Sequence, residues 1–201
     1  MTELAILQAI RLKGRVSPPD LAETVSLDLA EVADTVARLT AANLLVGDTT
    51  LRISPEGRVR LSELLTEERN AADATTLANV YDDFRSVNAA FKALVTEWQL
   101  RGGKPNSHDD ADYDAAILAQ LDDVHQRVEP IIATAATQLP RLHAYSRKLS
   151  AALGRVKAGE TAWLTRPLID SYHTVWFELH EELILAVGLT REQAARSGDA
   201  Q

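Results

Sequence analysis

The sequence predicts a mainly α-helical chain of two domains, the first of which contains one small β-hairpin. Apolar residues recur at helical spacing over most of the 201 residues. One short segment near residue 48 has the pattern of two strands around a turn. The region after residue 76 has no strand signal. We therefore predict domains over residues 1–68 and 69–201.

Three helices are predicted at the start of the first domain. The first, over residues 2–13, ends at Gly14, and Ser17 caps a second over residues 18–25 that begins with two prolines. A third is predicted over about residues 28–43. The apolar positions that predict the first and third helices are Leu4, Ile6, Leu7, Ile10, Leu29, Val32, Val36 and Leu39.

A hairpin and a fourth helix follow. The segment LLVGDTTLRIS, residues 44–54, predicts two short strands around a turn at Gly47 and Asp48. Ser54 then caps a helix that has Pro55 at its first position. This order of elements is that of a winged helix-turn-helix, with the third helix in the position of the recognition helix and the hairpin as the wing.

The segment ANLLVGDTTLRISPEGRVRL, residues 42–61, resembles the wing of MarR-like and PadR-like regulators. Those families often have strand, turn and strand, followed by a Ser/Thr-Pro-Glu-Gly-Arg motif. The resemblance covers roughly the first third of the chain. It implies a winged-helix fold, DNA as the partner and a homodimer that binds two half-sites.

The predicted DNA contacts come from the third helix, the wing and the helix after it. Cations and hydroxyls at those places are the groups that bind phosphates and base edges. The predicted residues are Ser26, Thr35, Arg38, Arg52, Arg58 and Arg60. The same helix also carries Glu31 and Asp34, which repel phosphate. Residues 1–69 contain 8 Lys/Arg and 11 Asp/Glu, a net charge of −3, so a domain that binds protein instead of DNA is the alternative.

Four helices are predicted in the second domain. They cover residues 75–100, 110–138, from Pro140 to about 157, and 167–187, with a kink at Pro130. Short connections between amphipathic helices favour an antiparallel four-helix bundle. We expect this bundle to dimerise, to bind a small-molecule effector, or both.

Histidines mark the last predicted helix. His173, Trp176 and His180 share one stripe and are the predicted ligand-binding residues. Asp122/His125 and Asp170/His173 have the spacing of carboxylate–histidine metal pairs. Packed or hydrogen-bonded histidines explain the same spacing, so we predict neither a metal site nor a cofactor.

A second resemblance concerns the later helices. The segments YDDFRSVNAAFKALVTEWQ, residues 81–99, and FELHEELILAVGLTRE, residues 177–192, resemble helical modules of actinobacterial proteins grouped near pyruvate phosphate dikinase and other PEP-utilising proteins. This resemblance implies an accessory, protein-binding module. No catalytic histidine motif of that group matches here.

Composition limits the function further. The formal net charge is −8, which disfavours general binding to polyanions, and the absence of cysteine excludes disulfides and thiolate chemistry. No apolar run is long enough to span a bilayer, so we expect a cytoplasmic protein without membrane contact. No residue pattern predicts an enzyme. A DNA-binding transcriptional regulator is the predicted function, and the accessory module is the alternative.

Overall fold

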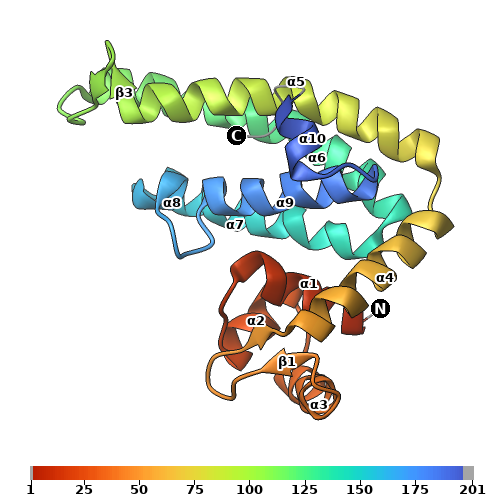
Figure 1. Cartoon of the computed structure of the whole chain (residues 1–201). Helices are drawn as coiled ribbons and strands as arrows, with labels where there is room; N and C mark the ends of the chain where they lie inside the picture. The colour runs from red at the N-terminus through yellow and green to blue at the C-terminus, as the bar shows by residue number, and fades with distance from the viewer. Residues whose placement is uncertain (1, 197–201) are drawn as a thin grey trace. The chain divides into compact units, whose positions relative to one another are not determined.

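The computed structural model describes residues 2–196 and divides the chain into two compact units (Figure 1), Met1–Ala72 and Asp73–Gln201. The division lies four residues after the predicted boundary at 68/69 because the fourth helix continues to Ala71. Both units are mainly helical, and each contains one small antiparallel hairpin.

The N-terminal unit contains four helices and one hairpin, coloured red to orange in Figure 1. Its predicted order of elements is confirmed, and the helix bounds differ from the predicted ones by at most two residues in the first three helices. The elements are α1 (Thr2–Lys13), α2 (Pro18–Val25), α3 (Leu29–Ala41), β1 (Leu45–Val46), β2 (Arg52–Ile53) and α4 (Pro55–Ala71).

Capping side chains set where these helices begin. Ser17 Oγ accepts the Asp20 N–H at 3.3 Å, and Asp28 Oδ1 accepts the Ala30 N–H at 2.8 Å. Ser54 does more than cap α4. Its Oγ accepts the Gly57 N–H at 2.8 Å and donates to the Asn43 carbonyl at 2.7 Å. One hydroxyl therefore joins the end of the α3 segment to the start of α4.

The wing consists of the β1–β2 hairpin and one additional β-bridge. β1 and β2 pair antiparallel, with Leu45 opposite Ile53. Val16, between α1 and α2, forms a bridge with Leu51, in which the two N–H···O hydrogen bonds measure 3.3 and 2.8 Å. Gly47 has φ +97° and forms the start of the turn. The chain before α2 is thus hydrogen-bonded to the hairpin.

An aliphatic core fills this unit. Its buried polar side chains, which are uncharged, belong to Gln8, Thr24, Thr35 and Ser54. Burial of the aliphatic side chains is the main contribution to the stability of such a unit. The most buried of them are Ile6, Leu7, Ile10, Leu21, Val32, Leu45, Leu51 and Leu61.

The C-terminal unit contains four longer helices and several short elements. The long helices are α5 (Ala74–Gln99), α6 (Ala111–Gln138), α7 (Ala144–Lys157) and α9 (Tyr172–Ala186). The short elements are β3 (Leu100–Arg101), β4 (Lys104–Pro105), the 3₁₀ helix η1 (Pro140–His143), α8 (Ala162–Thr165) and α10 (Arg191–Arg196).

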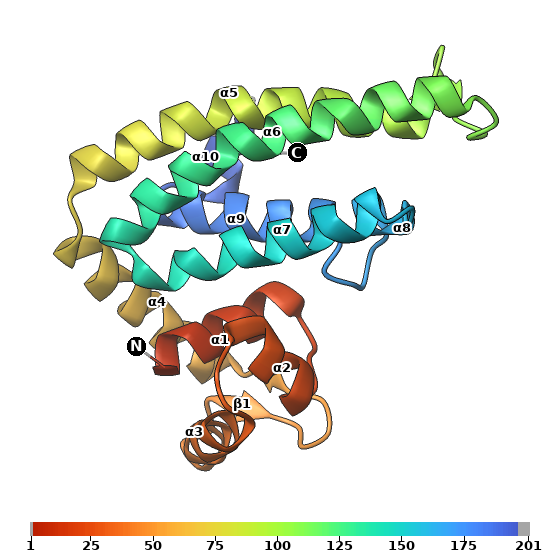
Figure 2. The ribbon, with the colours of Figure 1, turned by 180° about the vertical axis from the view of Figure 1, so that it is seen from behind.

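Each long helix packs on two others. α5 contacts α6 and α9, and α7 contacts the same two helices. Figures 1 and 2 show that successive long helices run in opposite directions. α6 is continuous through Pro130. The side chains buried between the helices include Phe84, Phe91, Leu121, Val128, Leu149, Tyr172 and Leu179.

Two predictions for this unit are wrong. The fourth long helix begins at Tyr172 and not at Pro167, because Ser171 is its N-cap and accepts the Thr174 N–H. The predicted absence of strands also fails, since β3 and β4 pair around Gly102 and Gly103. Both glycines have positive φ, 59° and 77°, as a tight hairpin turn requires.

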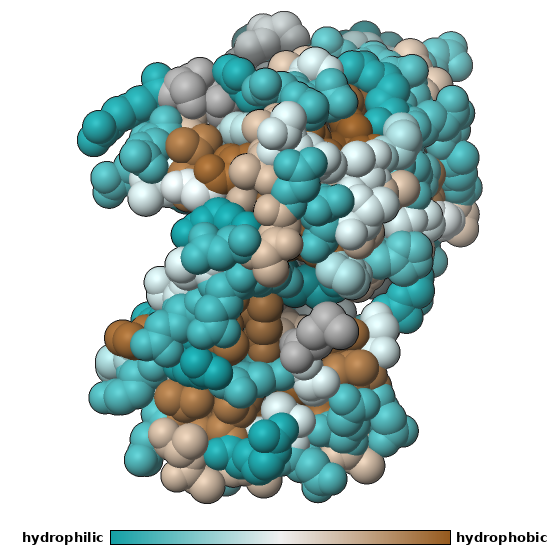
Figure 3. All heavy atoms as spheres, turned by 90° about the vertical axis from the view of Figure 1, so that its right-hand side faces the viewer, coloured by the Kyte–Doolittle hydropathy of each residue, from teal (hydrophilic) through white to brown (hydrophobic). Residues whose placement is uncertain are grey.

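Apolar side chains also reach the surface. In Figure 3 scattered brown residues interrupt a mainly teal, hydrophilic face. Single exposed apolar residues are normal in folded proteins. The large ones are Leu29, Val46, Val59, Leu100, Leu168 and Phe177.

Candidate functional site

The solvent-exposed face of α3 is acidic. Glu31 and Asp34 are exposed on it, as is Arg38, whose Nη2 donates to Thr35 Oγ1 at 3.2 Å. Thr35 itself is only 3% exposed. Its side chain is buried in this conformation, and the contact of Thr35 with DNA stays a prediction. Ser26, the residue that ends α2, is exposed and has a left-handed backbone.

The predicted arginines have different surroundings. Arg52 on β2 and Arg58 in α4 are exposed and have no carboxylate partner among the described residues. Arg60 instead donates to Glu3 Oε1 at 3.0 Å and to Glu63 Oε2 at 3.3 Å. These hydrogen bonds, that to Glu3 first, raise the pKa of Arg60. Arg52 and Arg58 are therefore better placed than Arg60 to bind a phosphate.

A pocket of about 410 Å³ lies between α5 and α9. All three residues predicted to bind a ligand line it, because His173, Trp176 and His180 follow one another on the same side of α9. Sequence reasoning missed the α5 wall. The other lining residues are Asn88, Phe91, Lys92, Ala93, Val95, Thr96, Gln99 and Phe177.

Trp176 is held in one orientation in this pocket. Its Nε1–H donates to Asn88 Oδ1 at 2.9 Å, a contact between two buried side chains. Two rings of α5 pack on Trp176. The centre of the Phe91 ring lies 4.5 Å from that of Trp176, and the centre of the Phe84 ring lies 5.2 Å from it. Trp176 and Phe91 give the pocket an aromatic floor, and the Phe84 ring packs behind Trp176.

The two pocket histidines are packed against aromatic rings. The His173 ring lies 6.1 Å from Phe91, and burial lowers the pKa of His173. The His180 ring lies 5.3 Å from Phe84 and 6.4 Å from Tyr81. A neutral His173 imidazole retains one N–H donor and one acceptor nitrogen.

The Asp-x-x-His pairs do not converge. Asp122 forms an ion pair with Lys157 at 2.6 Å, and Asp170 precedes α9 and lies 3.9 Å from Lys148. Within residues 2–196, no group of three or more His, Asp or Glu side chains is arranged to hold a metal ion. Asp122 and Asp170 are thus ion-pair partners of lysines.

His125 sits in a small polar cluster of its own. Its Nδ1 lies 3.2 Å from the Tyr172 hydroxyl, and its Nε2 lies 3.3 Å from Ser150 Oγ and 3.6 Å from Glu129 Oε1. Burial lowers the pKa of His125, and Glu129 and Asp122 oppose that effect. Serine and glutamate approach the same ring nitrogen, whereas a hydrolytic triad places them on opposite nitrogens.

Charged side chains are buried between α9 and the segment formed by η1 and α7. Glu182, 2% exposed, pairs with Arg141 Nη1 at 2.7 Å and accepts the Tyr145 hydroxyl at 3.3 Å. Glu178, 3% exposed, pairs with Lys148 at 3.3 Å. We call these five residues the buried ion network. Burial, then the two glutamates, raise the pKa of Tyr145.

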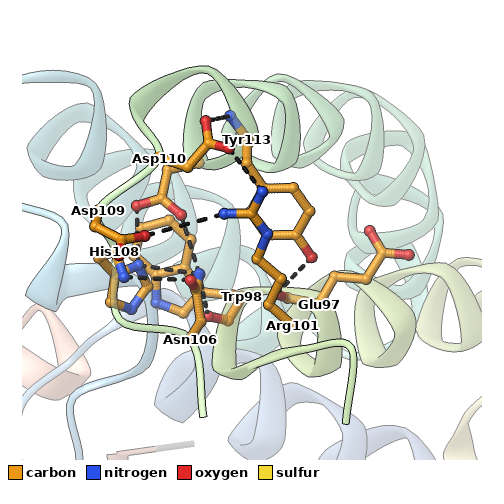
Figure 4. A network of polar contacts seen from close by, with 9 residues as sticks. Glu97, Trp98, Arg101, Asn106, His108, Asp109, Asp110 and Tyr113 are labelled. Carbon is orange, nitrogen blue, oxygen red and sulfur yellow. Dashed lines mark hydrogen bonds and ion pairs between the residues drawn. The ribbon is translucent and has the colours of Figure 1, made fainter. Parts of the chain in front are cut away.

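A second polar network surrounds the β3–β4 hairpin (Figure 4). Arg101 donates to Asp110 at 2.7 Å, and its guanidinium lies 4.7 Å over the Tyr113 ring. The His108 ring lies 4.4 Å from the Trp98 ring. The Tyr113 N–H, followed by Arg101, lowers the pKa of Asp110. These groups satisfy one another, so the network fixes the α5–α6 connection.

No protein-family model, curated protein or solved structure matches this chain. Among the helices of residues 2–196, none combines the length and the apolar content needed to cross a membrane. Two features of the described residues are candidate functional sites: the exposed face of α3 with its neighbouring arginines, and the α5–α9 pocket.

Proposed function

We propose that the N-terminal unit is a winged helix that binds duplex DNA and that the chain is a transcriptional regulator. The observation that carries this proposal is the Val16–Leu51 bridge, which joins the segment before α2 to the wing. The bridge, together with the order of α1, α2, α3 and the hairpin, supports a winged helix-turn-helix. One face of α3 is exposed to solvent.

That face has the dimensions and groups of a groove reader. α3 has 13 residues, which corresponds to roughly 20 Å of helix, and a major groove admits one helix. Arg38 can donate to guanine. Arg52 and Arg58 supply positive charge for the flanking phosphates.

For the C-terminal unit we infer an antiparallel four-helix bundle of α5, α6, α7 and α9. The contacts of each helix with two others support this assignment. In the proposed regulator the bundle joins two chains into a homodimer, since paired half-sites need paired recognition helices. The α5–α9 pocket is the proposed effector site.

DNA binding by the full chain is the direct test. We expect anisotropy titrations against fragmented genomic DNA to detect sequence-selective binding that weakens steeply between 50 and 200 mM salt. The double variant Arg52→Ala/Arg58→Ala should weaken binding to all sequences and should lower the salt slope by about 2, because each lost phosphate contact lowers it by about 1.

Arg85→Ala is the matched control for this experiment. Arg85 is an exposed arginine of α5 paired with Asp82, so its loss removes one charge from the other unit. It should leave the affinity and the salt slope unchanged. Absence of any salt-dependent binding at 50 mM salt contradicts the proposal.

The acidic face of α3 favours a second candidate function, an accessory module that docks on a basic partner protein. Glu31 and Asp34 would then be contacts, whereas in a DNA complex they repel phosphate. The variant Glu31→Gln/Asp34→Asn separates the two functions. Tighter DNA binding by this variant than by the unmodified chain supports the regulator. If neither the variant nor the unmodified chain binds DNA, the accessory module is supported.

A further inference from the structure

The α5–α9 pocket has an unusual charge for this chain. The formal net charge of the protein is −8, yet among the residues that the structure describes the pocket lining contains no Asp or Glu and a single cation, Lys92. Lys92 is partly buried and has no carboxylate partner among residues 2–196. A partly buried cation without a counter-ion attracts one negative charge from solution.

The rest of the lining is suited to an apolar body. Phe177, 38% exposed, supplies most of the accessible apolar surface. Phe91, Val95 and Trp176 form the buried floor behind it, and the hydrogen bond from Trp176 to Asn88 fixes the largest ring. The lining on α5 extends from Asn88 to Gln99, roughly 16 Å along the helix. The space is therefore elongated.

We propose that this pocket binds a small organic monocarboxylate, with the carboxylate paired to Lys92 and the apolar body against Phe177, above the floor formed by Phe91 and Trp176. One lysine neutralises one negative charge, which favours a monoanion over a dianion. His173 and Thr96 line the same pocket and supply further hydrogen-bonding groups. This inference goes beyond DNA binding, and its test uses no DNA.

Calorimetry with the full chain provides that test. The probes are benzoate and octanoate, their neutral isosteres benzamide and octanamide, and the dianion phthalate. We expect saturable one-to-one binding of a monocarboxylate, at least about tenfold tighter than its amide, as the loss of a hydrogen bond to a charged group predicts. Preference for benzoate assigns a planar body to the ligand, and preference for octanoate assigns an alkyl body.

Variants locate the charge. Lys92→Met should remove the preference for carboxylate over amide, whereas Phe177→Ala should weaken both by a similar factor. Lys104→Met is the control, because Lys104 is an exposed lysine on β4 outside the pocket. Circular dichroism of each variant checks that it is folded.

Three outcomes overturn the proposal: no saturable binding of either monocarboxylate at millimolar concentration, equal binding of acid and amide, or unchanged selectivity in Lys92→Met. Tighter binding of phthalate than benzoate also contradicts it. This inference deepens the proposed effector site. Failure of ligand binding removes that effector site and leaves the DNA-binding proposal standing, and failure of DNA binding leaves all of these measurements unaffected.

Discussion

The two units of this chain have different interiors. In the N-terminal unit, aliphatic side chains surround a few buried polar groups that carry no charge, such as Gln8 and Ser54. In the C-terminal unit, Glu178 and Glu182 are as buried as the core leucines and face the cations of the buried ion network. Aromatic rings also stack there between α5 and α9.

This difference indicates how each unit selects its structure. Burial of aliphatic side chains is not directional, so it stabilises any arrangement that excludes water from them. A buried carboxylate is tolerated only opposite its own cation, because an unpaired buried charge is costly. The network therefore restricts how α7 and α9 pair, whereas the first unit depends on capping and turn residues for its precision.

The largest expected effect comes from breaking the network. Glu182→Ala leaves Arg141 charged and without its closest carboxylate, and we expect it to lower the free energy of unfolding of the C-terminal unit by about 3–5 kcal/mol. Urea unfolding followed by circular dichroism measures this. Glu63→Ala, which removes a surface partner of Arg60, is the comparison and should have little effect. A similar small effect for both would contradict the role of the network.

The aliphatic core gives the next effect. Leu7, completely buried in α1, leaves a cavity when replaced by alanine, and we expect Leu7→Ala to cost about 2–5 kcal/mol. Leu29→Ala is the control, since Leu29 is half exposed. Denaturant titration measures the free energy of unfolding of both variants. An equal loss in Leu7→Ala and Leu29→Ala would contradict the role of the aliphatic core.

A capping residue of the first unit gives a smaller effect. Ser54→Ala removes both hydrogen bonds of the Ser54 hydroxyl and should cost about 1–2 kcal/mol. Ser17→Ala also removes two hydrogen bonds, one from the Asp20 N–H and one to Asp20 Oδ2, but both are exposed to solvent, so its cost should be nearer about 0.5 kcal/mol. Thermal unfolding ranks the two variants, and the reverse order would disprove this account of the hydroxyl.

The smallest effect is a pH dependence confined to the C-terminal unit. Burial lowers the pKa of His125 and of His173 below the ordinary 6.5. The unfolded chain then binds more protons than the folded one, so stability is present above pH 6.5 and declines as the pH falls through that value. Unfolding measured between pH 7 and 5 should show this decline.

The double variant His125→Gln/His173→Gln should flatten that decline. Aspartates with a lowered pKa, such as Asp73 and Asp110, lose their contribution only below their ordinary value of 3.8, outside the measured range. An unchanged slope in the double variant would assign the pH dependence to other groups.

Local signals explain what the sequence could predict. Ser17, Ser54 and Gly47 act through neighbours a few residues away, and each was found at its expected place. Where local signals competed, the stronger one decided the outcome. Pro167 suits a helix start, but Ser171 has a capping hydroxyl, and Leu168 has φ 67°, which breaks a helix.

Long-range contacts explain what the sequence could not predict. His173, Trp176 and His180 follow helical spacing on one helix, so the sequence could predict that they project from the same side of it. Lys92 completes the pocket from a helix about 80 residues earlier, and no periodicity reports that pairing. The burial of Thr35 depends likewise on tertiary packing. The β3–β4 hairpin did have a local signal, the Gly102–Gly103 pair.

The double contact of Ser54 has a consequence for protein engineering. Because that hydroxyl joins Asn43 to Gly57, both ends of the intervening segment stay fixed whatever lies between them. The tip of the wing, residues 47–50, is exposed. It is therefore a suitable place to insert a peptide tag or a fluorophore without disturbing the helices on either side.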